Sequence, residues 1–570
     1  MSCCNHVMKA QASSALLALL VSGLASVAAT TDTYAGGSDN AVTIKVTGDP
    51  LNRITTSPLS LSPAFAQTTT DYVWRCQPGT NNIDVRITAI SGGTITVDGN
   101  SGPTVALQES LAENQAVIIT APDPINAQGP PVQYWIRCLP HDFPQLSVTK
   151  PGSPPAGWYL TGNDVPAGGS STYAMVLDNN GTPVWYQKSA DLGALDVTLL
   201  SDRTIAWATN EGGGVGTDPN AAFEDFDPST RVTREIKAPV SPMDFHELHE
   251  MPNGDLMMLS SPLKSDVDLT GLGFSSSATI IDCVIQEVTP KGQLAWEWRA
   301  SDHISAAEST HPLTMMVNGQ SVYDIYHCNS IDTDTALDSV LLSSRHTDAV
   351  YLIDSASGTI IWKMGGNSLS HDNAQILTIT DDPEGTFHAQ HDARFEPDND
   401  ISLYDDQTWD AQLAARGVEY HVDAAAGTAT LVWSYASPDG HNATATGSFR
   451  RLDGGNDNVI GWGYKADTLF TEVDAAGKVM LNVTFPAGDF IYRVQKVPTT
   501  AIDVGLLRAT AGLAPSASGA APRAAPRAAP LPKPLSATRL NLEVALAMLC
   551  VIGSFLAGFA WLRRRRLRLP

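Results

Sequence analysis

A hairpin that recurs along the chain constrains the fold more than any other feature of the sequence. Each copy is an alternating apolar strand, then Asp or another turn residue followed by Gly, and then a second strand that often ends in Trp. The copies are found at residues 173–185, 284–296 and 350–362, before Trp433, before Leu481 and, in degenerate form, from Phe223. A unit of this size cannot bury its apolar face alone, so neighbouring copies must stack on one another.

A second type of hairpin alternates with the first. It is clearest after Met251, Phe395 and Leu452, where short apolar strands flank turns rich in Asn, Asp and Gly. Two hairpins per unit, about six units and the lack of helical periodicity predict an all-β fold, a six-bladed β-propeller over residues 155–500. Seven blades is the alternative count.

The segment before the repeats has a different pattern. Residues 40–150 contain short alternating apolar runs, separated by turn residues at regular intervals. This pattern predicts a small N-terminal β-sandwich.

Both ends of the chain resemble targeting segments. Residues 1–30 combine a lysine, an apolar run and small residues, which predicts a secretory signal peptide, with a retained anchor helix as the alternative. Residues 513–540, rich in Ala and Pro, predict a semi-rigid stalk. Residues 544–562 carry no charge and precede four arginines, which predicts a C-terminal transmembrane helix with its basic end in the cytoplasm. We therefore expect an extracytoplasmic body on a single-pass anchor, soluble when the chain ends near Leu507.

The cysteines agree with an oxidising compartment. Three of the seven lie in the terminal segments, which leaves Cys76, Cys138, Cys283 and Cys328 in the body. An even number in a secreted body suggests two disulfide bonds. Sequence order favours Cys76–Cys138 and Cys283–Cys328 among the three possible pairings.

The net charge excludes one class of partner. The chain has 35 Lys plus Arg against 60 Asp plus Glu, a net charge of -25. Nine basic residues and one acidic residue lie from residue 513 onward, so the body is more acidic than the total. Such a body repels phosphate backbones, so we expect no nucleic-acid partner.

The histidines cluster in the middle of the repeats. Nine of the 13 lie between His246 and His391, in strings at comparable places in the repeat. The inner strands of successive blades would direct such residues toward one axis. For any single histidine, the alternative is an ordinary polar residue bonded to a backbone carbonyl.

Three converging imidazoles could also bind zinc. Asn329 and Arg345, which accompany them, are poor zinc ligands, and an arginine matches a tetrahedral oxyanion. The set therefore favours transfer of a sulfate-like or phosphate-like group, and we predict no metal and no cofactor.

The strings resemble the bacterial arylsulfate sulfotransferases, which use an aryl sulfate ester as donor instead of a nucleotide-linked sulfate. The resemblance covers roughly residues 155–495. It rests on the order of four blocks: His-Glu-x-x-x-x-Pro-Asn-Gly at His246, His-x-Asn-Ser at His327, Ser-Ser-Arg at Arg345 and Gln-His-Asp at His391.

The resemblance implies a six-bladed propeller and a covalent sulfohistidine intermediate. His391 would be the nucleophile, and His246 and His327 would transfer protons and stabilise oxygen. Asn329 and Arg345 would hold the sulfuryl oxygens. Ser448 is a weaker candidate for a hydroxyl contact. Because His388 and His249 lie in the same strings, the choice within each pair depends on neighbouring residues.

Three functions are consistent with these features. The first is a ping-pong, nucleotide-independent transferase that moves a sulfuryl group from an aryl sulfate donor to a phenolic acceptor. The second is a non-catalytic surface propeller that binds a ligand or partner, because a fold does not fix a function. The third is a hydrolase that gives the sulfuryl group to water.

Overall fold

The structure is a computed structural model that describes residues 41–126, 128–165, 171–189, 193–209, 221–317, 319–334, 336–465, 469–485 and 488–516. The predicted signal peptide (1–30), most of the predicted stalk and the predicted anchor (544–562) lie outside these ranges. Within them, no helix is both long and apolar enough to cross a bilayer.

The N-terminal part consists of sheets that enclose one apolar core. The first sheet has the order β1 (Ala41–Lys45), β9 (Ala116–Ala121), β10 (Val132–Leu139), β4 (Asp71–Arg75). The second has the order β3 (Leu51–Ser57), β5 (Asn81–Ala89), β8 (Thr104–Leu111). A small third sheet contains β2 (Thr47–Gly48), β6 (Ile95–Val97) and β7 (Asn100–Gly102). The predicted Cys76–Cys138 bond is present beside this core.

The remaining described residues contain six antiparallel four-stranded units. In the order from inner to outer strand, the first three are β40 (Val494–Val497), β12 (Trp158–Gly162), β13 (Tyr173–Leu177), β14 (Pro183–Lys188); β15 (Ala194–Leu199), β16 (Ile205–Thr209), β17 (Phe223–Asp227), β18 (Val232–Ile236); and β19 (Met243–Glu250), β20 (Leu256–Ser260), β23 (Val284–Val288), β24 (Leu294–Arg299).

The other three units, in the same order, are β27 (Cys328–Asp334), β28 (Ser339–Ser344), β29 (Ala349–Asp354), β30 (Ile360–Gly365); β32 (His391–Glu396), β33 (Asp400–Asp405), β34 (Arg416–Asp423), β35 (Thr428–Ala436); and β36 (Ser448–Leu452), β37 (Asp457–Gly461), β38 (Phe470–Asp474), β39 (Val479–Thr484). Two short strands extend the units: β31 (Gln375–Thr380) joins β30 to β35, and β11 (Ser147–Thr149) pairs with β39.

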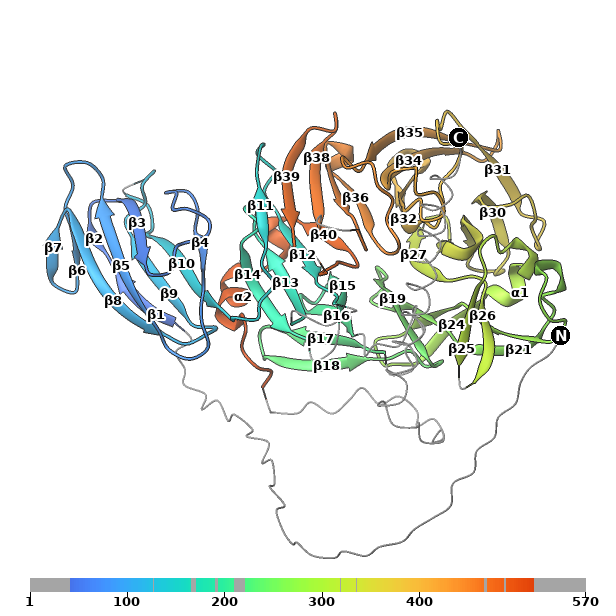
Figure 1. Ribbon diagram of the computed structural model, residues 1–570, viewed down its shortest axis with the longest axis horizontal. Helices are drawn as coiled ribbons and strands as arrows, with labels where there is room; N and C mark the ends of the chain where they lie inside the picture. Colours follow the sequence, from blue (N-terminus) through green and yellow to red (C-terminus); the bar gives the residue numbers. More distant parts are fainter. Residues whose placement is uncertain are drawn as a thin grey trace, which may run out of the picture.

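The six units close into a ring, which Figure 1 shows to the right of the N-terminal sheets. Each inner strand contacts the inner strands of its two neighbours, in the cyclic order β40, β15, β19, β27, β32, β36. The ring closes where β40, from the end of the described chain, pairs antiparallel with β12, from its beginning. This is the arrangement of a six-bladed β-propeller.

The two predicted hairpins occupy fixed places in each blade. The recurring hairpin forms the two outer strands, for example β29 and β30, and the second hairpin forms the two inner strands, for example β32 and β33. The Gly of the motif closes the outer turn. Gly358 has φ 73° and donates its N–H to the Asp354 carbonyl at 2.8 Å, a left-handed conformation that favours glycine.

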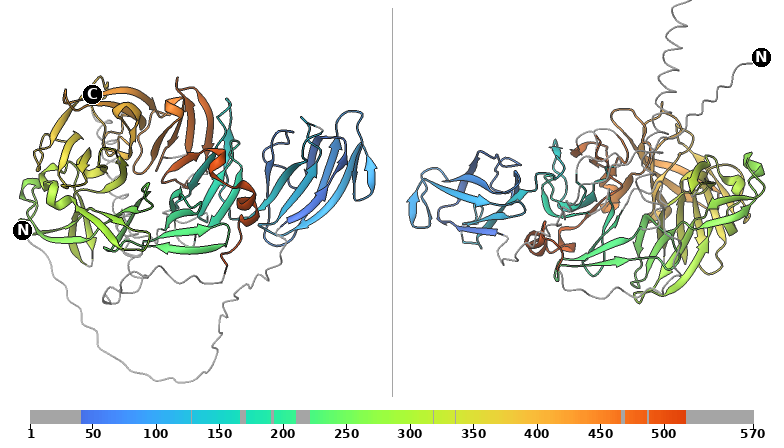
Figure 2. Two further views of the ribbon diagram at one scale, coloured as in Figure 1. Left: turned by 180° about the vertical axis from the view of Figure 1, so that it is seen from behind. Right: turned by 60° about the horizontal axis from the view of Figure 1, so that its bottom comes forward.

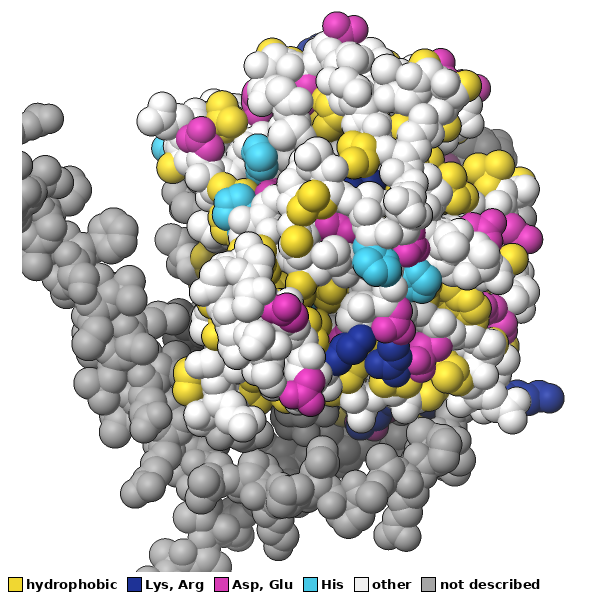
Figure 3. All heavy atoms as spheres, turned by 90° about the vertical axis from the view of Figure 1, so that its right-hand side faces the viewer, with side chains coloured by type: hydrophobic (Ala, Val, Ile, Leu, Met, Phe, Trp, Pro, Cys, Tyr) yellow, Lys and Arg dark blue, Asp and Glu magenta, His cyan; other side chains and the backbone are white. Residues whose placement is uncertain are grey.

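One sheet was not predicted. It has the order β21 (Leu263–Val267), β22 (Ala278–Ile281), β26 (Gln320–Asp324), β25 (Leu313–Val317), and it combines insertions from two places in the chain. Helix α1 (Ala300–His303) lies between them in the sequence, on the side of the ring opposite the sandwich (Figure 1). On this side, acidic and basic side chains are intermingled in the part that the structure describes (Figure 3).

The last described helix joins the two parts of the molecule. Helix α2 (Val504–Thr510) lies between the sandwich and the ring in both orientations of Figure 2. The Arg508 guanidinium donates to Asp71 at 2.8 Å, and Leu507 is buried in the core of the neighbouring blade. The expected end of a soluble body near Leu507 therefore cuts through a packed helix, and the body extends beyond it.

Candidate active site

Three of the predicted histidines lie near the beginning of neighbouring inner strands. His246 is in the first half of β19, His327 directly precedes β27, and His391 opens β32. Inner strands of a propeller run in the same direction around the axis, so these positions share one end of the ring. The rings of His246 and His327 meet edge to face, with centroids 5.0 Å apart. Both lie close enough to His391 to interact with it electrostatically.

A buried carboxylate holds each of these imidazoles at Nδ1. The pairs, with their Nδ1–Oδ distances, are His246–Asp244 (2.5 Å), His327–Asp324 (2.6 Å) and His391–Asp406 (2.7 Å). In the last pair, Nδ1 also lies 3.1 Å from the Ala389 carbonyl, so this nitrogen carries the proton. Each ring therefore has Nε2 as the nitrogen with a lone pair, which can attack an electrophile or accept a proton.

Irregular registers in the inner strands help to aim these side chains. The pairing shifts within four of them, between Leu195 and Thr198, Met243 and Leu248, Cys328 and Ser330, and His391 and Arg394. A β-bulge redirects the side chains next to it and is common beside active sites.

Arg345 lies at the same end of the ring, in the short helix η3 (Arg345–Thr347) between β28 and β29. Its guanidinium carbon is 4.7 Å from the centre of the Trp409 ring. Its Nη1 contacts His346 Nε2 at 3.0 Å, and its Nη2 donates to the Thr444 carbonyl at 3.0 Å. The Nε–H is buried and has no hydrogen-bond partner among the described residues. A buried donor of this kind costs about 1–3 kcal/mol unless a ligand oxygen accepts from it.

Burial lowers the pKa of two of these imidazoles, those of His327 and His391. It lowers the pKa of His327 to about 4, although the Asp324 carboxylate opposes this change. Burial, followed by the charge of Arg345, lowers the pKa of His391 well below its ordinary value. Burial also raises the pKa of Asp406, and the charge of Arg345 opposes this change. At neutral pH, both imidazoles are therefore in the form that can act as nucleophile or base.

The two predicted substrate contacts differ in their surroundings. Asn329 Nδ2 donates to the Gln390 carbonyl at 2.8 Å, which brings the amide beside the residue that precedes the predicted nucleophile. The Ser448 hydroxyl accepts from the Val494 N–H at 3.1 Å and lies 3.4 Å from its carbonyl. This hydroxyl therefore joins β36 to the closing strand, and its contact with substrate stays a prediction.

The two other histidines of these strings lie elsewhere. His249 Nε2 is 2.9 Å from the Thr333 hydroxyl, further along the inner strands. The His388 side chain is about one-third exposed and lies 3.6 Å from the Asp348 carboxylate.

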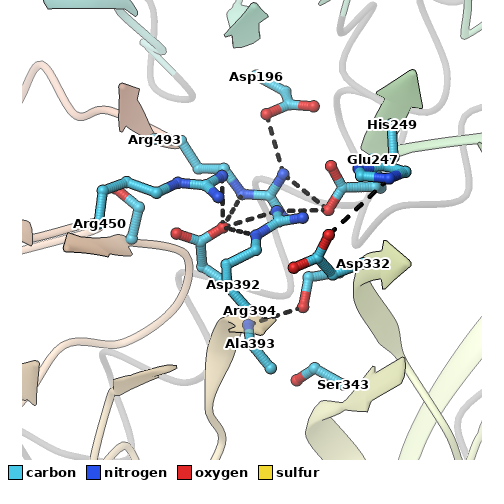
Figure 4. A network of polar contacts seen from close by, with 12 residues as sticks. Asp196, Glu247, His249, Asp332, Ser343, Asp392, Ala393, Arg394, Arg450 and Arg493 are labelled. Carbon is cyan, nitrogen blue, oxygen red and sulfur yellow. Dashed lines mark hydrogen bonds and ion pairs between the residues drawn. The ribbon is translucent and has the colours of Figure 1, made fainter. Parts of the chain in front are cut away.

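A network of buried charges occupies the axis beside the histidines (Figure 4). All six blades contribute to it or to its contacts, and the closest pairs are Asp196–Arg493 (2.9 Å), Glu247–Arg394 (2.7 Å), Glu247–Arg493 (3.1 Å), Asp392–Arg394 (2.7 Å) and Asp392–Arg450 (2.8 Å). Arg493 also donates to the Asn329 carbonyl at 2.5 Å. Burial tends to raise the pKa of Glu247, but the charges of Arg394 and Arg493 outweigh it and lower this pKa to about 2. The network fills the axis and fixes the inner strands relative to one another.

The second predicted disulfide, Cys283–Cys328, is present at the edge of the site. It borders a cavity of about 10 Å³ that Asp244, Asp324 and His327 also line. This volume is at the lower limit of the space that one water molecule needs. The bond therefore ties the residue after His327 to the adjacent blade without filling the space around the imidazole.

Asp324, His327 and His346 bring donor atoms within 4.8 Å of one another, a set that could hold a metal ion. Both ring nitrogens of His346 are already in hydrogen bonds, Nδ1 to the Asp324 carbonyl at 2.9 Å and Nε2 to Arg345. The guanidinium also repels a cation here. The expectation of no metal stays a prediction.

Several residues of the site were missed from the sequence. Asp244 and Asp324 precede their histidines by two and three residues, so the spacing alone offered a signal for them. Asp406 and Trp409 come from the loop after β33 and lack such a signal, because only the closed ring brings them beside His391 and Arg345.

A sequence model of the family described as Arylsulfotransferase (ASST) matches residues 160–493. The match covers more than half of the chain and includes all the histidines described above. The chain belongs to the arylsulfotransferase family. An aryl sulfotransfer enzyme is the activity that this membership supports.

No curated protein matches the chain. Among solved structures, TolB from Acinetobacter baumannii is 10% identical over 79% of this chain and 83% of its own, with a TM-score of 0.36. The periplasmic gluconolactonase PpgL of Pseudomonas aeruginosa is 11% identical over 60% of this chain and 99% of its own, with a TM-score of 0.33. AztD from Citrobacter koseri is 9% identical over 60% and 98%, with a TM-score of 0.29.

Proposed function

We propose that this arylsulfotransferase moves a sulfuryl group from an aryl sulfate ester to a phenolic acceptor through a sulfohistidine on His391. The observation that carries the proposal is the combination at one end of the ring. Three imidazoles are held at Nδ1 by buried carboxyl groups, next to an arginine whose buried Nε–H lacks a partner among the described residues.

In the first half-reaction, His391 Nε2 attacks the sulfur atom of the donor. The new S–N bond forms as the bond between sulfur and the aryl oxygen breaks, and the aryl oxide leaves. Arg345 Nε and the Asn329 amide donate to the sulfuryl oxygens. Positive charge that develops on the imidazole is shared with Asp406 through Nδ1–H. Donors placed for the transition state supply most of the stabilisation in such transfers.

In the second half-reaction, the phenol oxygen of the acceptor attacks the same sulfur atom, and the S–N bond breaks. His246 or His327 accepts the phenol proton at Nε2. That histidine then gives the proton up, directly or through solvent, to the aryl oxide released in the first half-reaction, so the histidine is regenerated and the full cycle is neutral. The two half-reactions use one site, which gives ping-pong kinetics.

We infer that the enzyme works outside the cytoplasm. Both disulfide bonds are formed in the body. Such bonds persist in oxidising compartments. This location agrees with the predicted signal peptide and anchor, which lie outside the described residues.

The proposal is tested by trapping the intermediate. The full chain is incubated with 4-nitrophenyl sulfate, without an acceptor, and digested for mass spectrometry. We expect the mass of one sulfuryl group on the peptide that contains His391. Addition of a phenol should remove the label and produce the sulfated phenol.

His391→Ala should lose the label and lower turnover by at least about a thousandfold, because no other nucleophile replaces it. His388→Ala is the matched control, three residues earlier in the same loop, and should keep the label. Label retained in His391→Ala but lost in His388→Ala would reassign the nucleophile within the loop. Sulfate release to water at the same rate with and without phenol would show a hydrolase instead.

A further inference from the structure

One buried carboxylate, Asp348, connects the two loops that carry Arg345 and His391. It directly follows η3, is 2% exposed and has a left-handed backbone with φ 49°. Its Oδ1 accepts from the Trp409 indole N–H at 2.9 Å and from the Ala389 backbone N–H at 2.7 Å. These two donors come from different loops of the fifth blade.

On one side, this carboxylate holds the Trp409 ring, on which the Arg345 guanidinium stacks. The Trp409 ring lies under Arg345, and its N–H holds it to Asp348. The stacked His311 ring, 4.1 Å away at an angle of 13°, covers Trp409 further. Rotation of the indole would therefore break its hydrogen bond to Asp348 and remove the surface on which the guanidinium rests.

On the other side, it fixes the peptide before the predicted nucleophile. Ala389 has φ 54°, a conformation that costs a non-glycine residue about 1–2 kcal/mol. Its N–H donates to Asp348, and its carbonyl accepts from His391 Nδ1. The carboxylate thus holds a strained peptide that orients the imidazole.

The charge of Asp348 is maintained by its surroundings. Burial opposes ionisation, but hydrogen bonds from His311, His388 and Thr310 hold the pKa of this carboxyl well below its ordinary value. Thr310 donates at 2.6 Å, and His311 Nδ1 lies at 3.1 Å. The group is therefore an anion over the whole neutral range, with strong acceptor oxygens.

We propose that Asp348 and Trp409 form a positioning unit that sets the distance between the oxygen-binding arginine and the nucleophilic histidine. This inference rests on the proposed function. Because both loops are held by one carboxylate, its loss shifts the two groups relative to each other. A shift of about 1 Å costs on the order of a hundredfold in rate. The affinity for the donor depends on each loop separately, so it changes less than the rate of sulfation.

The experiment measures the two half-reactions of Asp348→Asn in the full chain. The amide keeps the shape of the carboxyl group but lacks its charge and one acceptor oxygen. We expect the single-turnover rate of His391 sulfation by 4-nitrophenyl sulfate to fall about 10- to 100-fold. KM for this donor should change less than about threefold.

Trp409→Phe provides a second variant at a partly exposed position that tolerates replacement. It keeps an aromatic ring near Arg345 but cannot donate to Asp348. We expect an intermediate loss, about 3- to 10-fold in the sulfation rate.

Asp372→Asn is the matched control. Asp372 also lies between two histidines, His303 at 2.8 Å and His371 at 3.1 Å, but outside the site. In this variant, the rate of His391 sulfation should stay within about twofold of the wild-type rate.

Wild-type sulfation rates in both Asp348→Asn and Trp409→Phe would overturn the positioning role while leaving the proposed function intact. An equal loss in Asp372→Asn would also overturn it, because the effect would then be a general loss of stability. If the wild-type chain forms no sulfohistidine, the proposed function fails, and this inference falls with it.

Discussion

At the scale of single residues, the site depends on which nitrogen of each imidazole is free. The carboxylates at Nδ1 determine this, and burial determines the charge. The histidine strings pointed to these residues in the sequence, and their roles stay predictions. The hydrogen bonds that fix their tautomers required the structure, because Asp406 approaches His391 from the loop after β33.

The low pKa of His327 predicts that activity is lost only at an unusually acidic pH. With a pKa of about 4, His327 is still almost entirely neutral at about pH 5.5. We expect kcat/KM to change less than about twofold between pH 7.5 and 5.5 and to fall only near pH 4. A pH–rate profile with a limb near pH 6.5 would contradict this expectation and indicate an exposed histidine.

The stability of the folded chain should also decrease at acidic pH. The folded-state pKa of His327 lies below its unfolded value of about 6.5. The unfolded chain therefore binds this proton more readily between about pH 6.5 and 4, and stability falls as the pH decreases through that window. The lowered pKa of Asp324 acts in the same sense, since its contribution is lost as the carboxylate is protonated.

At the scale of elements, the hairpins were predictable because they are local. Apolar alternation and a turn glycine are properties of about a dozen consecutive residues, as in β29 and β30. The sheet of β21, β22, β26 and β25 was missed because its parallel pair, β22 with β26, joins segments about 40 residues apart. The bulges in the inner strands were missed for a similar reason, since they depend on contacts around the axis.

The inner strands depend on the charges between them. Asp392 accepts from Arg394 and Arg450 and from the Phe449 N–H at 3.1 Å. Asp392→Asn removes the ion-pair partner of the buried Arg450 and one of the two carboxylates that Arg394 contacts, so we expect unfolding free energy to fall by about 3–5 kcal/mol. Urea denaturation measures the change.

The control for this variant is Asp400→Asn. Asp400 pairs with the half-exposed His421 at 2.7 Å, and its loss should cost less than about 1 kcal/mol. Equal effects of the two variants would show that the axial network contributes no more than a surface pair.

At the scale of the whole molecule, the C-terminal boundary of the folded body can be tested. A chain ending at residue 516 keeps α2, with Leu507 in the core and Arg508 on Asp71. We expect it to be soluble and as stable as the full body.

A chain ending at residue 503 lacks this helix. It leaves Arg137, whose guanidinium donates to the Arg508 and Ala511 carbonyls, with fewer acceptors between the sandwich and the ring. We expect its melting temperature to fall by several degrees, since a lost buried contact of about 2–4 kcal/mol is a large part of total stability. Equal melting temperatures for the two chains would show that α2 contributes nothing to the body.

The position of the closing strand has a consequence for biosynthesis. β40 completes the first blade, and Arg493, just before it, is the cation beside Asp196 and Glu247. Until the ribosome has delivered this segment, those carboxylates face each other without it, and the ring has two open edges. Nascent chains therefore cannot complete the propeller one blade at a time. A pairing between residues more than 300 positions apart is also slow to form. A chain interrupted before residue 490 therefore lacks both Arg493 and the closing strand, and it cannot close the ring.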